Sequence, residues 1–275
     1  MMEKTMNKNR NVWMAIVYVL MFLGIQAFAG IVVTALALIF HNKGLTGSSA
    51  MQLIVSMVLF SVITVVVFLW TRWFKLSFSY LQSRPWVVLF WSVVAALGAI
   101  LPSMFCQELL PALPEWMQKL VDESEQQMVL LMQTRGGYMV LALLAPMVEE
   151  MVFRGCVLRS LLDWKPDRRW LMIGLSALLF ALSHLNPAQM PHAFVIGLLL
   201  GWMYCRTGSI VPGIVYHWAN NTAAYLLFAF YPDPSVCLSD IFGSRTVLAV
   251  VFSLCILLPA LFQLDQHMKK ASSQF

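Results

Sequence analysis

Long apolar runs recur along the entire chain, and they constrain its fold more than any other feature. A membrane-spanning helix needs about 20 predominantly apolar residues. Runs that reach or approach this length cover residues 12–40, 51–70, 86–105, 138–161, 170–184, 191–205, 210–231 and 246–264. The chain is 60% hydrophobic and only 11% charged, whereas a soluble domain is about half apolar and a quarter charged. The sequence therefore predicts an all-α, polytopic membrane protein with about eight transmembrane helices.

The first run is too long for the core of a signal peptide, and no small-residue cleavage site follows a short apolar core, so we expect a retained helix. The runs 170–184 and 191–205 are short, which leaves a re-entrant geometry open for them. The segment 107–137 is polar and acidic. We expect it to lie outside the membrane, with a short helix over 116–134, as a connector, a lid or a surface helix.

Lysine and arginine gather in alternate loops, which predicts an orientation. Cytoplasmic loops of membrane proteins carry an excess of these residues. They are found before the first run, after the second, fourth and sixth, and at the end of the chain: Lys4, Lys8, Arg10, Arg72, Lys75, Arg84, Lys165, Arg168, Arg169, Arg206, Lys269 and Lys270. The other loops hold only Lys43, Lys119, Arg135 and Arg245. An even number of spans in the cell (inner or plasma) membrane, with both termini cytoplasmic, satisfies this pattern.

The same loops account for the net charge of +5. No basic stripe is interleaved with aromatic residues, so we expect membrane lipid as a partner and no nucleic acid. The cysteines show no CxxC or other metal-binding spacing and are expected to be buried thiols. They are Cys106, Cys156, Cys205, Cys237 and Cys255.

Three ionisable side chains interrupt the run 138–161: Glu149, Glu150 and Arg154. Each charge at the bilayer centre costs roughly 2.5–3.5 kcal/mol on insertion scales, so such residues face a protein interior or a wet cavity and mark function. Glu150 and Arg154 are four residues apart and can pair on one helix face. Glu149 is rotated about 100° away, where desolvation favours a general base. The alternative is a charge cluster that only holds helices together.

Two further pairs at a four-residue spacing stand on other apolar runs. Phe180 and His184 share a face, so that the ring can pack over the imidazole and orient it. His217 and Asn221 form a neutral pair of donors that could stabilise a developing oxyanion, although His and Asn also link helices in membranes.

Two other polar residues near these pairs are left outside the predicted site. Asn220 points about 100° away from the face of its neighbours. His192 stands beside Pro191 at the start of a run and is expected at the membrane interface.

Together, EExxxR, FxxxH and HxxxN on three separate apolar runs resemble the CPBP family of type II CAAX prenyl endopeptidases and bacteriocin-processing (Abi) membrane proteases. The resemblance covers about residues 145–221 in the family's order, and Gly155 after the arginine also fits. It implies an intramembrane endopeptidase with its active site inside the helical bundle. Residues 138–231 would form the catalytic core, 1–137 the N-terminal helices and acidic loop, and 232–275 the last loop and helix, within one membrane domain.

The resemblance also implies catalytic roles. Glu149 would activate a water molecule, and His184 would help to hold or deprotonate it. His217 and Asn221 would stabilise the tetrahedral oxyanion. No serine or cysteine stands beside a histidine as a nucleophile would.

Supporting roles would fall to Glu150 and Arg154, as the pair that fixes the helix, and to Phe180 beside the imidazole. A metal is the alternative way to activate water, because Glu149, His184 and His217 could supply the carboxylate and two imidazoles of an open zinc site. The HExxH helix of common zinc proteases is absent. We therefore favour no cofactor.

Two non-enzymatic functions compete with proteolysis: a proton-linked transporter that uses the same acids, and a scaffold that binds partner helices. A transporter of this kind has two related halves with broken helices at matching positions, and the sequence has no such symmetry. For a protease, the resemblance implies a peptide or protein substrate, either lipidated at its C-terminus or a leader peptide of the bacteriocin type.

Overall fold

The computed structural model describes residues 2–41, 48–77, 79–233 and 236–272, and the regular structure of these residues is entirely helical. This confirms the predicted all-α class. The longest helices are α1 (Met2–His41), α2 (Ser49–Trp70), α4 (Trp86–Glu108) and α12 (Thr246–Ser272). Within the described residues, the segments long and apolar enough to cross a membrane are Arg10–Phe40, Ser49–Trp70, Trp86–Glu108 and Leu238–Met268. The chain is therefore an integral, multi-pass membrane protein.

The remaining apolar runs also form helices, but shorter ones. The run 138–161 becomes two π-helical turns alternating with two α-helices. These are η1 (Met139–Leu144), α6 (Ala145–Val152), η2 (Phe153–Leu158) and α7 (Arg159–Trp164). After the 3-10 turn η3 (Pro166–Arg168) come α8 (Arg169–Leu182), α9 (Met190–Thr207) and α10 (Val211–Phe230). Whether these shorter helices complete a set of eight transmembrane spans stays a prediction.

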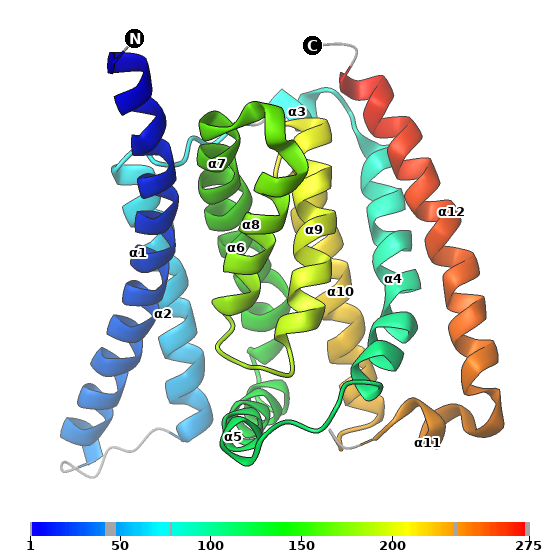
Figure 1. The fold of residues 1–275 in the computed structure, drawn as a ribbon. Coiled ribbons are helices and arrows are strands. Elements are labelled where there is room, and N and C mark those ends of the chain that lie inside the picture. Colours follow the sequence, from blue (N-terminus) through cyan, green and yellow to red (C-terminus); the bar gives the residue numbers. More distant parts are fainter. Residues whose placement is uncertain (1, 42–47, 78, 234–235, 273–275) are drawn as a thin grey trace.

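The long helices stand in two pairs on either side of the shorter ones (Figure 1). On one side α1 packs against α2, and on the other α4 packs against α12, while α6 to α10 lie between them. The start of α1 and the end of α12 lie at the same end of the bundle (Figure 1). That arrangement agrees with termini on one side of the membrane, although the side itself stays a prediction. Lys43, one of the residues counted for orientation, lies outside the described residues.

Proline and glycine set the ends of the central helices. Pro191 and Pro212 occupy the first turns of α9 and α10, where a missing N–H removes no helical hydrogen bond, whereas Pro146 of α6 follows directly on η1 in one continuous helical stretch. Gly208 ends α9 in the left-handed conformation, with φ +66°, and its N–H bonds to the Tyr204 carbonyl at 2.8 Å. Pro191, Gly208 and Pro212 thus mark where α9 begins, where it ends and where α10 begins.

The pairing of α4 with α12 depends on a glycine and on a proline inside α4. A Cβ atom on Gly98 would lie 2.8 Å from the backbone nitrogen of Leu257, so only glycine permits this approach. Pro102 has no N–H to offer the Gly98 carbonyl one turn earlier. Instead Ser253 of α12 donates its hydroxyl to that carbonyl, at 3.0 Å. A neighbouring side chain thus satisfies the backbone group that the proline frees.

A separate helix, α5 (Glu115–Met132), lies across the end of the bundle opposite the start of α1 (Figure 1). It confirms the short helix predicted over 116–134. It packs on α2 and α10, and hydrogen bonds add to this packing: the Tyr225 hydroxyl donates to the Met132 carbonyl at 2.8 Å, and the Asn186 amide donates to the Ser124 hydroxyl at 3.0 Å. The remaining elements are short: α3 (Ser79–Gln82), α11 (Leu238–Phe242) and the 3-10 turn η4 (Gly243–Arg245).

Candidate active site

The predicted pair of Glu150 and Arg154 forms in the interior of the bundle. Nη1 of Arg154 donates to Oε1 of Glu150 at 2.7 Å. The side chain of Glu150 is 0% exposed and that of Arg154 is 1% exposed. Nη2 also donates to the Gly197 carbonyl of α9, at 3.3 Å. The guanidinium lies 4.4 Å from the centre of the Phe180 ring, which adds a cation–π contact. Because it contacts two other helices, Arg154 ties α8 and α9 to the helix that carries the acids.

His217 of α10 lies between the two glutamates. Its Nδ1 is 3.3 Å from Oε1 of Glu150, and its Nε2 is 3.7 Å from Oε2 of Glu149. Glu150 therefore contacts His217 as well as Arg154, whereas the sequence suggested a role only beside the arginine. The sequence could not show this contact because it joins residues 67 positions apart. Glu149 is the more accessible acid, with 20% of its side chain exposed.

The second oxygen of Glu150 is confined by α10. A Cβ atom on Gly213 would lie 2.8 Å from Oε2 of Glu150, so the glycine gives the carboxylate its space. Within the described part of the chain, this Oε2 is buried without a hydrogen-bond partner. Unsatisfied buried polar atoms are costly and few in native structures, and a catalytic role is one of the explanations for them. The signal in the sequence was Gly213 itself, one helical turn before His217.

Phe180 packs on both histidines of the predicted site. Its ring meets His184 edge-on at 4.8 Å between centroids and His217 at 6.0 Å, as the FxxxH spacing predicts for His184. The Nδ1 atom of His184 is 2.9 Å from the Phe180 carbonyl. Because a carbonyl can only accept, Nδ1 carries the proton and Nε2 of the neutral ring is free to accept one. The next residue, Leu185, has φ +54°, which turns the chain sharply after the histidine.

Asn221 is held by groups around it rather than left free. Its Nδ2 donates to the Leu141 carbonyl at 3.0 Å, within the π-helical turn η1. Its Oδ1 accepts from Nδ2 of Asn220 at 3.3 Å. Asn220, which the sequence left outside the site, thus orients Asn221. π-Helical turns are rare and frequent at functional sites, and this one offers a carbonyl to the predicted oxyanion residue.

The described residues hold no group of three His, Cys, Asp or Glu side chains arranged to bind a metal ion. Glu149 approaches His217, but no such group brings His184 together with these two residues. The arrangement does not fit the zinc site considered from the sequence, and no catalytic step is assigned to a metal.

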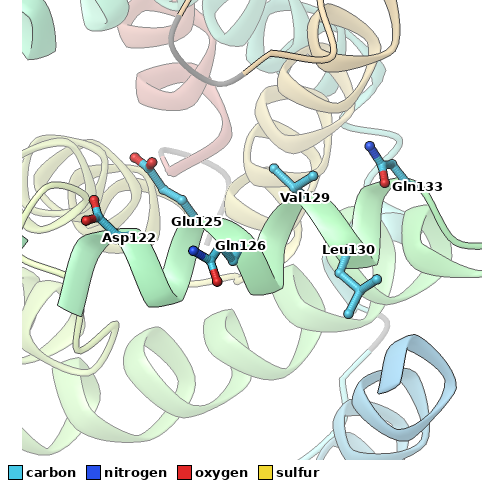
Figure 2. A pocket seen from close by; sticks show the side chains of 6 residues that line it. All are labelled: Asp122, Glu125, Gln126, Val129, Leu130 and Gln133. Atoms are coloured by element: carbon cyan, nitrogen blue, oxygen red, sulfur yellow. The ribbon is translucent and has the colours of Figure 1, made fainter. Parts of the chain in front are cut away.

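A cavity of about 570 Å³ lies against α5 (Figure 2). It is lined by Asp122, Glu125, Gln126, Val129, Leu130 and Gln133. Partial burial, and to a lesser extent the charge of Asp122, raises the pKa of Glu125. None of the motif residues lines this cavity, so it is a feature of the acidic segment and separate from the buried cluster around His217.

A buried cluster of acids, arginine and histidine inside a helical membrane bundle places the chain among multi-pass membrane proteins with an intramembrane polar site. Residues 133–223 match the family described as Type II CAAX prenyl endopeptidase Rce1-like, so the chain contains a domain of that family. The matched segment is about a third of the chain and includes all three motifs. Comparisons with curated proteins and with solved structures find no match.

Proposed function

We propose that this protein is an intramembrane endopeptidase that hydrolyses a peptide bond with a water molecule activated by Glu149. The observation that carries the proposal is His217, held between Glu149 and Glu150 inside a domain of the CAAX endopeptidase family. Such a family implies a protease, and a buried acid beside an imidazole is suited to general acid–base chemistry.

Glu149 is the general base because it is the acid that remains partly exposed. Its carboxylate takes a proton from water as the water oxygen attacks the substrate's carbonyl carbon. His184 accepts a hydrogen bond from the same water through its free Nε2. The proton then passes from Glu149 to the departing amine nitrogen as the C–N bond breaks. The products are a carboxylic acid and an amine.

His217 stabilises the oxyanion, and its two neighbours explain how it can donate. An ionised Glu150 can only accept, so Nδ1 of His217 carries a proton. Its Nε2 faces the space beside Glu149, 3.7 Å from Oε2 of that acid, and donates from there to the developing oxyanion. Asn221 contributes the N–H that is not used on Leu141.

We also infer that the helices between the outer pairs cross the membrane, giving about eight spans with both termini cytoplasmic. Support comes from the chain path, which runs back and forth along the bundle through the stretch 139–164 and then α8, α9 and α10 (Figure 1). Labelling of single introduced cysteines by a membrane-impermeant reagent tests this inference. Cysteines at Ser83 and at Asp167 should react from the cytoplasmic side, and one at Gln127 from the opposite side. Labelling of all three from one side would contradict the topology.

The proposed substrate is a peptide with a prenylated cysteine near its C-terminus, because the family's description names prenyl endopeptidases. A leader peptide without a lipid is the alternative. The test uses protein in lipid nanodiscs and two fluorogenic peptides of the same sequence, one farnesylated on the fourth residue from its C-terminus and one not. Preference for the farnesylated peptide supports the first substrate class, whereas preference for its twin supports the second.

Three variants test the mechanism. Loss of a general base or of an oxyanion donor lowers kcat by about 10²- to 10⁴-fold. We expect a loss of this size in Glu149→Gln, His184→Ala and His217→Ala, each with the inserted and folded state of the wild type. Full activity in any one variant removes that residue from the mechanism, and wild-type protein that cleaves neither peptide contradicts the protease. Activity should persist with a metal chelator.

A further inference from the structure

Outside the family motifs, a serine of α4 meets a histidine of α9. Ser103 Oγ and Nδ1 of His192 share a hydrogen bond, and both residues are partly buried. The interfacial position of His192 stays a prediction, and the contact joins this residue to a helix 89 positions away in the chain. Ser103 itself lies outside the segment that matches the family.

The pair adjoins the predicted catalytic histidines. His192 interacts electrostatically with both His217 and His184. It stands in the first turn of α9, and α4 packs on α10, the helix that carries His217, and on α9. The Ser103–His192 pair therefore borders the site from the side of α4, which contributes no motif residue.

Helix α4 holds this pair firmly. Ser103 directly follows Pro102. The carbonyl of Gly98, which Pro102 leaves without its helical partner, accepts a hydrogen bond from the hydroxyl of Ser253 on α12. The close approach of Gly98 to the backbone of Leu257 fixes the same stretch. A side chain at this position has little freedom, so the imidazole bonded to it is held in one orientation.

Peptide-bond hydrolysis inside a membrane makes a demand that the motif residues do not meet. The substrate must be extended around the bond that is attacked, and its neighbouring backbone N–H and C=O groups then lack helical partners. At membrane depth such groups need a hydrogen bond from the protein. In the mechanism above, Glu149, His184, His217 and Asn221 all act on the reacting atoms.

We propose that Ser103 and His192 form a subsite that binds the backbone of the extended substrate next to the reacting bond. Ser103 occupies Nδ1 of His192 and so leaves Nε2 for a peptide N–H or C=O. The ligand class is a secondary amide of a peptide chain, whatever its side chains. This inference rests on the proposed proteolytic function.

The test measures substrate binding apart from cleavage. The farnesylated peptide and its unprenylated twin are titrated onto Glu149→Gln protein in nanodiscs, with and without His192→Phe. Loss of one hydrogen bond should weaken binding of the better-binding peptide by about three- to tenfold. In protein with Glu149 intact, KM should rise by the same factor while kcat changes less than about threefold. His267→Phe, on α12, is the matched control and should change neither.

A series of peptides with one backbone amide N-methylated in each locates the contact. N-methylation at one position of the peptide should weaken its binding to Glu149→Gln protein. The same N-methylation should not weaken binding to the Glu149→Gln/His192→Phe double variant. Ser103→Ala should give a smaller loss than His192→Phe, and Ser103→Thr, which keeps the hydroxyl, should restore binding.

Unchanged affinity in His192→Phe, or an N-methyl profile identical in both proteins, overturns the subsite, and so does the absence of saturable binding. A failure of the proposed function looks different. In that case wild-type protein cleaves neither peptide, while binding to Glu149→Gln protein still depends on His192.

Discussion

The outer helices α1, α2, α4 and α12 are long, continuous and apolar, whereas the central stretch 139–164 alternates between π and α geometry and carries two acids and an arginine. The outer helices meet lipid with many interchangeable apolar side chains. The centre depends on a few contacts at fixed distances, among them Glu150 with Arg154 and His217. Length and apolarity are enough to specify the outer helices, whereas in the central stretch each charged side chain needs a particular partner.

The largest effect that separates the two regions is expected from Glu150→Ala. It leaves Arg154 buried without its carboxylate, and breaking a buried pair in this way costs about 3–5 kcal/mol. The matched outer change is Val66→Ala in α2, where the side chain is 56% exposed to the membrane side and little stability should be lost. Thermal unfolding in nanodiscs measures both. Equal losses in the two variants would remove the distinction between the regions.

A second comparison uses two glycines in central helices. In Gly213→Ala the new Cβ would lie 2.8 Å from Oε2 of Glu150, and overpacking of this kind costs typically about 1–3 kcal/mol. A Cβ atom on Gly174 in α8 would meet no neighbouring heavy atom within 4 Å. Gly174→Ala should therefore be neutral or gain up to about 1 kcal/mol from helix propensity. Unfolding midpoints that move equally would show that Glu150 does not need the space.

A smaller effect is expected where an outer helix does rely on one polar contact. Ser253→Ala removes the donor to the Gly98 carbonyl, and hydrogen bonds between membrane helices contribute about 0.6 kcal/mol on average and up to about 1.7. Pro102→Ala restores a backbone N–H that can bond to the same carbonyl. The double variant should be more stable than Ser253→Ala alone by the same unfolding assay. If the double variant is less stable, then Pro102 stabilises the packing of α4 by more than the backbone hydrogen bond that it prevents would.

The smallest effect concerns α5, which belongs to neither region. The pKa of Glu125 is raised above the ordinary 4.5 by partial burial and the charge of Asp122. The folded protein therefore holds this proton more tightly than the unfolded chain, and the packing of α5 weakens slightly as pH rises from 4.5 through the raised pKa. Glu125→Gln should remove this dependence, as measured by hydrogen exchange in α5 after correction for intrinsic rates. Glu123→Gln, on the same helix, controls for loss of a charge, and an equal response in both would assign the effect to net charge.

The sequence predicted what depends on local spacing. Each apolar run is helical, and the four-residue intervals placed Glu150 beside Arg154 and Phe180 beside His184. It could not predict the contact of Glu150 with His217, because a pair 67 residues apart leaves no periodic trace. The π-helical turns were also invisible, since their apolar residues read like those of any helix. The catalytic roles of Glu149, His184, His217 and Asn221 remain predictions.

The same 67-residue separation has a consequence for biosynthesis. Glu150 leaves the ribosome well before His217 and Gly213, which complete its surroundings. A segment with three ionisable side chains is costly to release into lipid alone, so it should stay beside the insertion machinery until α10 is made. The pair α1 and α2 needs no such delay. We therefore expect the buried polar cluster to set the timing of assembly, and nascent chains that end before Gly213 should keep the acidic segment within reach of water-soluble reagents.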